Sequence, residues 1–147
     1  MKSGVPVEGL ANPLRRLVAR ILDMLTVVVL GLMVLPFFDV SAGDPTTLRG
    51  GPFLAFLAIW GVYEIGLTSW RGMTIGKMAA RVKVVDRSTG RTPSLLVCAV
   101  RWMVPAAAGL IPYLGLIGWV VVYMWILGDV NRQGLHDKLA GTLVVNE

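Results

Sequence analysis

Residues 94–128 read SLLVCAVRWMVPAAAGLIPYLGLIGWVVVYMWILG, and the number of helices in this stretch decides the fold. As one helix it would measure about 52 Å, well beyond the roughly 30 Å hydrocarbon core of a bilayer. Its middle, residues 109–115, holds two glycines and a proline, which favour a tight turn because proline removes a backbone donor and glycine relaxes the chain. We therefore expect two antiparallel helices, over residues 94–110 and 113–128.

Two further apolar stretches, residues 17–38 and 52–70, have the length of about 20 residues that a membrane-crossing helix needs. The 147-residue chain is 55% hydrophobic and 16% charged, which is too apolar for an ordinary soluble domain. The first stretch is too long for the apolar region of a signal peptide, so its helix should remain in the mature protein. These features predict an all-α membrane protein, a bundle of four transmembrane helices. The alternative is three, with residues 94–102 along the interface.

Basic residues gather at two places, before the first apolar stretch and between residues 71 and 93. Such residues mark cytoplasmic segments, so we expect residues 1–13 to form a cytoplasmic tail and residues 39–50 to lie outside. The net charge of +5 then reflects orientation in the membrane, and we expect no nucleic-acid partner.

Two polar segments, residues 81–86 and 141–146, have the alternation and the β-branched residues typical of strands. If they pair as a small cytoplasmic β-hairpin-like element, both lie on one side of the membrane. An even number of crossings between them is then required, and this favours four spans over three.

Ionisable residues in or beside the apolar stretches are the candidate site residues, because a charge at the bilayer centre costs at least about 2.5 to 3.5 kcal/mol. Arg16 and Asp23 share one face of the first helix, with the small Ala19 between them. Arg20, three residues from Asp23, is an alternative partner for that carboxylate. The full set of intramembrane or interfacial charges singled out is Arg16, Asp23, Glu64, Arg101, Asp129 and Asp137.

Two contacts between these charges follow from the topology. Glu64 and Arg101 lie at similar depth in the inner half of the membrane, and an ion pair would lower the insertion cost of each. With four spans, Arg16 should meet Asp137 at the cytoplasmic surface, close to Lys77 and Arg101. Structural pairing is the simpler interpretation of these carboxylates. A proton or cation site is the alternative for the carboxylate of the first helix.

The sequence contains no catalytic constellation. Residues 72–77, GMTIGK, look like a phosphate-binding loop but have the wrong spacing and no preceding strand. His136 beside Asp137 lacks a nucleophile at motif spacing, and one histidine cannot build a histidine-rich metal site. The single Cys98 excludes an intrachain disulfide. We expect no enzymatic activity, no cofactor and no metal.

Several motifs occur in an order that resembles the RDD family of small bacterial membrane proteins, named for an arginine and two aspartates. Residues 16–23 resemble its first signature, and residues 134–145, with Asp137, resemble its second. The family's central pattern is followed by residues 72–77, 82–86 and 90–94 and by Arg101. The resemblance implies a single transmembrane domain over residues 14–146, in a multi-pass protein of the bacterial cytoplasmic (inner) membrane with a cytoplasmic N-terminus. For activity it implies only that monovalent cation/proton antiport is proposed for some members.

Small size and the lack of a catalytic set favour an accessory or assembly subunit of a larger membrane complex, with a protein partner or a second copy of the chain. The alternative is a monovalent cation/proton antiporter acting as an oligomer, because one chain of this size is too small for alternating access. The basic inner loop also suits anionic lipids at the cytoplasmic face, where each Lys or Arg adds roughly 1 kcal/mol of attraction. Orientation alone is the simpler explanation of that loop.

Overall fold

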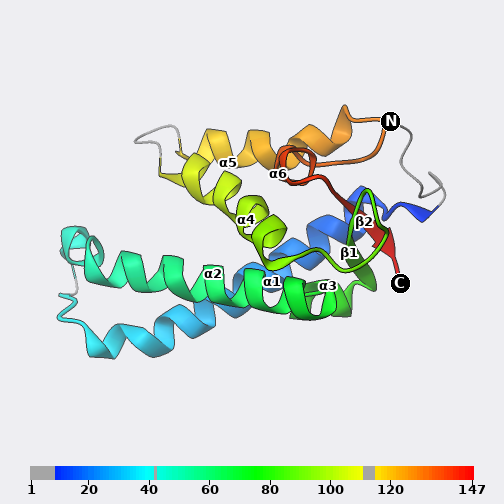
Figure 1. Cartoon of the computed structure of the whole chain (residues 1–147). Helices are drawn as coiled ribbons and strands as arrows, with labels where there is room; N and C mark the ends of the chain where they lie inside the picture. Colours follow the sequence, from blue (N-terminus) through cyan, green and yellow to red (C-terminus); the bar gives the residue numbers. More distant parts are fainter. Residues whose placement is uncertain (1–8, 42, 111–114) are drawn as a thin grey trace.

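The computed structural model describes residues 9–41, 43–110 and 115–147. These residues are mostly helical, with one two-stranded sheet at one end of the helices (Figure 1). The predicted combination of a helical bundle and a small β element is therefore confirmed in its broad outline.

The first helix, α1 (Pro13–Val34), begins before the expected residue 17 because Asn12 and Pro13 form a start signal. The Asn12 side chain accepts a hydrogen bond from the Leu14 amide at 2.9 Å, and proline fits the first helical position. A short 3-10 helix, η2 (Leu35–Phe37), continues α1. Together they form a 25-residue segment long and apolar enough to cross a bilayer.

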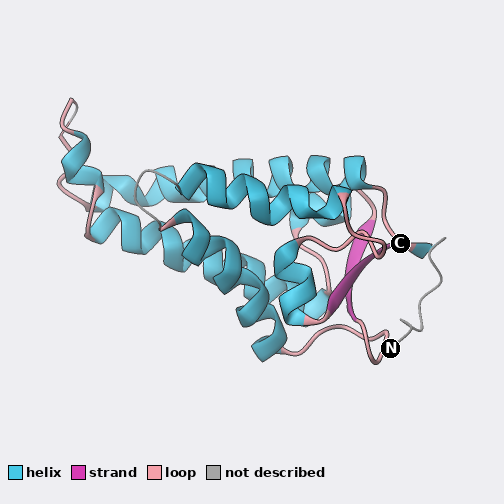
Figure 2. Cartoon of the chain, turned by 90° about the horizontal axis from the view of Figure 1, so that it is seen from above, coloured by secondary structure: helices cyan, strands magenta, loops and turns pink. Residues whose placement is uncertain are grey.

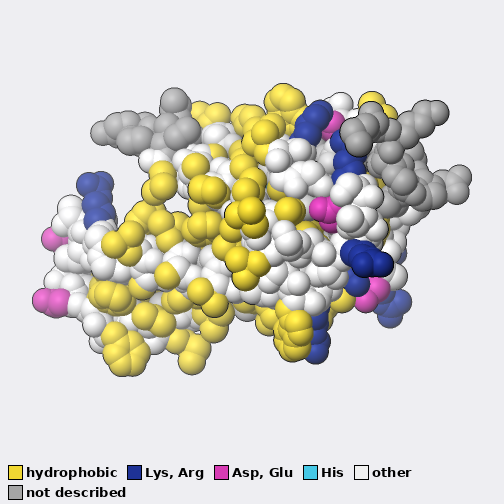
Figure 3. All heavy atoms as spheres, viewed as in Figure 1, with side chains coloured by type: hydrophobic (Ala, Val, Ile, Leu, Met, Phe, Trp, Pro, Cys, Tyr) yellow, Lys and Arg dark blue, Asp and Glu magenta, His cyan; other side chains and the backbone are white. Residues whose placement is uncertain are grey.

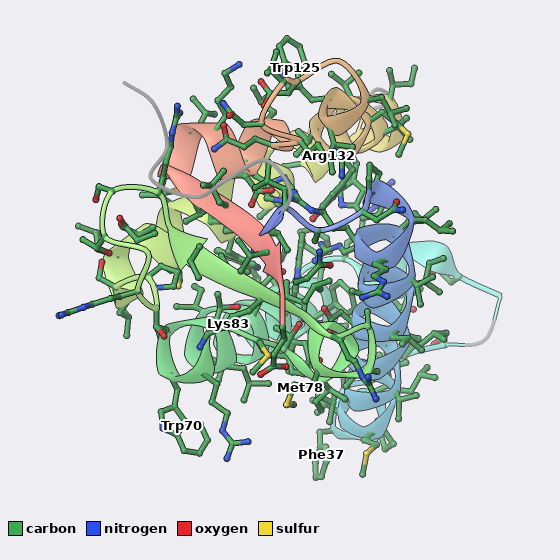
Figure 4. The ribbon with its side chains drawn as sticks, turned by 90° about the vertical axis from the view of Figure 1, so that its right-hand side faces the viewer. Phe37, Trp70, Met78, Lys83, Trp125 and Arg132 are labelled. Atoms are coloured by element: carbon green, nitrogen blue, oxygen red, sulfur yellow. The ribbon has the colours of Figure 1, made fainter. Side chains whose placement is uncertain are left out.

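The second long helix, α2 (Gly51–Arg71), follows a short 3-10 helix, η3 (Pro45–Leu48), and also has the length of a span. It ends at Gly72, whose positive φ of 76° suits glycine and whose amide donates to the Thr68 carbonyl at 2.8 Å. Near this end the Trp70 side chain points away from the body of the protein (Figure 4). Tryptophan is the kind of residue enriched at membrane interfaces.

The long apolar stretch forms α4 (Leu95–Gly109) and α5 (Gly115–Met124), which the 3-10 helix η4 (Trp125–Leu127) continues. The expected turn at Pro112 lies outside the described residues. At 15 and 10 residues, both helices are shorter than the roughly 20 residues that a crossing needs. In the described part of the chain, two helices therefore have the length of a span, and α4 and α5 form a hairpin of shorter apolar helices.

The two strands predicted from the sequence do pair. β1 (Val82–Asp86) and β2 (Thr142–Asn146) run antiparallel, and their inward side chains, such as that of Leu143, are fully buried. Ala11, before α1, extends this element, since its amide donates to the Val144 carbonyl at 2.9 Å. The last part of the expected N-terminal tail is thus packed against the sheet, a contact that the sequence did not predict.

Two short helices were also not predicted, because they are too short for a periodic pattern to reveal. α3 (Ile75–Ala79) lies between α2 and β1 and packs on α1, while α6 (Leu135–Ala140) precedes β2 and packs on α4. Their position beside the sheet decides where the polar residues of both loops lie.

The long helices form two pairs, α1 with α2 and α4 with α5, joined where α4 packs on α2. The pairs meet at the end that carries the sheet and diverge toward the opposite end (Figure 1). Figure 2 shows both strands beyond the ends of the long helices. Charged side chains gather at the two ends of the face shown in Figure 3, and apolar side chains cover its middle. A protein embedded in a bilayer has this distribution.

Candidate functional site

Seven charged side chains come together at the end of the bundle that carries the sheet, and no more than 12% of any of them is exposed. They belong to α1, α2, α3, α4 and α6. Ion pairs link each to the next, and we call the set the ion network: Arg16, Arg20, Asp23, Glu64, Lys77, Arg101 and Asp137. Four members are cations and three are carboxylates, so one positive charge is in excess.

Asp23 of α1 is held by donors from α2, α3 and the turn between them. The hydroxyls of Tyr63 and Thr74 donate to its carboxylate at 2.7 and 2.5 Å, and the Gly76 amide donates at 2.7 Å. The Lys77 ammonium lies 3.5 Å from the same group. These contacts converge on one side chain and fix α3 against α1.

The backbones of α3 and α1 approach closely because both helices have small residues at their contact. A Cβ atom placed on Gly76 would clash with the carbonyl oxygen of Ala19, so any larger residue would force the helices apart. Ala19 itself is 2% exposed. The face of α1 that the sequence marked for close approach is therefore used, and the short α3 occupies it.

Glu64 of α2 contacts three cations. Its Oε2 atom accepts hydrogen bonds from Arg20 Nη1 at 2.9 Å and from the Trp60 indole at 2.8 Å. Its Oε1 atom lies 3.4 Å from Arg101 Nη1 and 3.7 Å from Lys77 Nζ. The expected contact between Glu64 and Arg101 is present.

Arg20 does not pair with Asp23, the alternative that their spacing on α1 allowed. Its guanidinium instead reaches Glu64 and lies over the rings of Tyr123 and Trp119, 4.7 and 5.7 Å from their centroids. Donors from α2 and α3 already surround Asp23, and this leaves Arg20 to link α1 with α5 through its side chain.

Asp137 of α6 has Arg101 as its closest cationic partner. Arg101 Nε donates to Oδ1 at 2.7 Å, while Arg16 Nη1 lies 3.4 Å from Oδ2. The Gly134 amide and the Thr142 hydroxyl, each at 3.3 Å, also donate to the carboxylate. Burial alone would raise the pKa of Asp137, but the surrounding groups together, Arg101 first among them, outweigh it and hold that pKa well below its usual range. The structure thus brings Arg16 and Asp137 together, with Arg101 between the helices as the stronger partner.

His136 lies beside the ion network but is not one of its charged members. Its ring packs on Tyr123, with centroids 4.8 Å apart, and its Nε2 atom lies 3.4 Å from Arg101 Nη2. Burial lowers the pKa of His136 to about 4, so the ring is neutral at neutral pH.

Asp129, one of the intramembrane or interfacial charges singled out from the sequence, lies apart from the ion network. It follows η4 and accepts hydrogen bonds from Lys138 Nζ at 2.8 Å and from the amides of Asn131 and Gln133. These contacts close a polar turn. Asp129 therefore shapes the loop before α6.

Three residues that contact Asp23 were not among the charges singled out from the sequence: Tyr63, Thr74 and Lys77. Thr74 and Lys77 belong to the GMTIGK segment, whose glycines suggested a phosphate loop. That segment wraps around a carboxylate instead. Within the described residues, no group of three or more His, Cys, Asp or Glu side chains is arranged to hold a metal ion.

Replacing Asp137 by Asn should lower the free energy of unfolding by about 3 to 5 kcal/mol, because the buried Arg101 and Arg16 lose their carboxylate. The same substitution at the exposed Asp39 should change it by less than about 0.5 kcal/mol. Thermal unfolding in a mild detergent measures both variants. Equal losses at the two positions would contradict the structural importance of the buried pair.

His136 should make the protein less stable as the pH falls. Its pKa of about 4 in the folded protein lies below the ordinary 6.5, so the unfolded chain binds the proton first. Between pH 6.5 and 5 this lowers stability by up to about 1.4 kcal/mol per pH unit. His136→Gln removes the titration and should flatten melting temperature against pH in that range. A variant with the wild-type slope would show that another group is responsible.

Residues 10–141, nearly the whole chain, match the RDD family. An uncharacterized protein of Rickettsia prowazekii (strain Madrid E) is 31% identical over 83 residues, which cover 56% of this chain and 42% of that protein. The match thus spans less than half of that relative's length. No solved structure matches the chain. Arg16, Asp23 and Asp137, which resemble the family's arginine and two aspartates in sequence, are all members of the ion network. The chain belongs to the RDD family of membrane proteins.

Proposed function

We propose that the protein is a non-enzymatic accessory or assembly subunit of a larger membrane complex. The observation that carries this proposal is the pairing within the ion network. Each of its carboxylates, Asp23, Glu64 and Asp137, contacts at least one cation and at least one further donor from another element. Carboxylates held in this way suit the fixing of helices in one register.

An end fixed by charges leaves the apolar helix faces available for contacts in the membrane. On α1 the side chains of Leu25, Val29 and Leu32 are 57, 55 and 58% exposed. Their spacing of four and three residues places them in one stripe. A stripe of this kind faces lipid or packs on another helix, and it supports a protein partner or a second copy of the chain.

We further propose four crossings of the bacterial cytoplasmic membrane, with residue 9 and the C-terminal strand both on the cytoplasmic side. The antiparallel pairing of β1 with β2 supports this topology, because it keeps the segment after α2 and the end of the chain together. The hairpin of α4 and α5 would supply two crossings. Its short helices would require the bilayer to thin locally or their ends to be covered by neighbouring residues.

A monovalent cation/proton antiporter acting as an oligomer is the second candidate, and the contact between Lys77 and Asp23 favours it. The other three cations of the ion network are arginines, which stay protonated, whereas a buried lysine can release its proton. Burial lowers the pKa of Lys77. A neutral Lys77 would leave the negative charge of Asp23 without its cation, and a monovalent cation could then take that place.

Topology can be measured by cysteine labelling in a Cys98→Ala background. With four crossings, Glu147→Cys should resist an impermeant thiol reagent in intact cells and react once the membrane is permeabilised. Thr46→Cys, in the exposed loop after α1, should react in both conditions. Ready labelling of Glu147→Cys in intact cells would instead require an odd number of crossings between α2 and the end of the chain.

The accessory function predicts that proteoliposomes of the protein alone show no proton movement when Na⁺, K⁺ or Li⁺ is added. Solubilised gently from native membranes, the chain should migrate in a larger particle than the same chain purified alone. A cation-dependent proton flux that Asp23→Asn abolishes and Asp39→Asn retains would overturn the proposal in favour of antiport. Particles of identical size would also contradict it.

A further inference from the structure

The ion network surrounds a cavity of about 140 Å³ between α1, α4 and α5, and all seven of its members line the cavity. Its four cations and three carboxylates leave one positive charge in excess. An uncompensated charge in a low-dielectric site is costly, so the cavity favours a ligand with one negative charge.

Two of the arginines that line this cavity also have a buried nitrogen atom without an acceptor. Within the described residues, the Nε atoms of Arg16 and Arg20 are buried and make no hydrogen bond. The two arginines are four residues apart, on one face of α1, and their side chains both line the cavity. Guanidinium groups pair with phosphate oxygens through several parallel hydrogen bonds, which makes a phosphate the anion best matched to them.

The cavity opens on the apolar surface of the bundle. Leu17 of α1 and Val120 and Met124 of α5 form part of its lining, and these side chains are 47, 46 and 42% exposed. Among the described residues, α1 and α5 are not a closely packed pair, and Arg20 connects them through its contacts with aromatic rings. A ligand can therefore enter from the side, between two membrane-embedded helices.

An apolar path continues from the charged cavity along α1. A second cavity, of about 120 Å³, shares Arg20, Asp23, Glu64 and Trp119 with the first, so its near end is still charged, and it extends to the apolar Val28 and Phe56. A third, of about 260 Å³, starts at those last two residues and is lined by apolar side chains toward the other end of α1. The lining of the three cavities changes from charged to apolar in the direction of the bilayer centre. A lipid has the same order, from its charged headgroup to its apolar acyl chains.

We propose that the opening between α1 and α5 binds a phospholipid with one net negative charge, such as phosphatidylglycerol. Its phosphodiester lies in the charged cavity, against the guanidinium groups of Arg16 and Arg20, and one acyl chain follows the two further cavities along α1. The excess of one positive charge matches the charge of this headgroup. A zwitterionic headgroup carries a positive charge of its own and therefore does not neutralise the excess positive charge of the site. Phosphatidylcholine thus binds more weakly.

The test uses the purified full chain, delipidated in a neutral detergent, and its melting temperature as lipid is added. Saturating phosphatidylglycerol should raise the melting temperature by on the order of 5 °C. Phosphatidylcholine and inorganic phosphate, added at the same concentration, should give much smaller shifts. Equal shifts from both lipids would overturn the headgroup assignment. A full shift from inorganic phosphate would overturn the lipid assignment and leave a site for a free anion.

Two matched pairs of variants locate the site. Val120→Trp fills the opening, whereas Val121→Trp adds the same bulk to a neighbour that is equally exposed, at 47%, and does not line the cavity. Only Val120→Trp should abolish the phosphatidylglycerol shift. Arg20→Gln should weaken lipid binding by at least about tenfold, and Arg91→Gln, the same charge change at an exposed residue, should leave it unchanged. Equal effects within either pair would show that the lipid binds diffusely, without this site.

Discussion

The salt bridge between Arg101 and Asp137, 2.7 Å from Nε to Oδ1, is the contact on which the rest of the polar end depends. Arg101 lies inside the apolar stretch of α4, and its Nη1 atom lies 3.4 Å from Oε1 of Glu64 in α2. One side chain thus joins α2, α4 and α6. Removing one partner leaves a buried charge unpaired, which costs free energy, so the network is stable only when complete. The five elements that carry it therefore behave as a unit.

Much of this arrangement could be predicted from the sequence, because its causes are local or depend on membrane depth alone. Apolar stretches of about 20 residues identify the long helices. Helical spacing places Arg16, Ala19 and Asp23 on one face, and equal depth pairs Glu64 with Arg101. The alternation of β-branched residues identifies both strands, and the two do pair.

The parts that could not be predicted depend on how the chain reverses between elements. The donors of residues 74–77 reach Asp23 because Gly72, with its positive φ, turns the chain back toward α1 after α2 ends. Spacing along α1 allowed Arg20 as an alternative partner of Asp23, yet contacts between helices decide otherwise. Asp129 falls outside the network because the helical segment ends at Leu127 and the polar turn that follows holds its carboxylate.

Arg16 finds its acceptors near the other end of the chain: Asp137 and the Val144 carbonyl lie 121 and 128 residues further on. Domains form in order during synthesis, from the N-terminal side, so α1 meets the membrane long before these acceptors exist. Until then the Arg16 guanidinium has no partner to offset the cost of burial and must stay in contact with water. The final depth of α1 in the membrane is therefore fixed only after α6 and β2 have been synthesised and have bound Arg16.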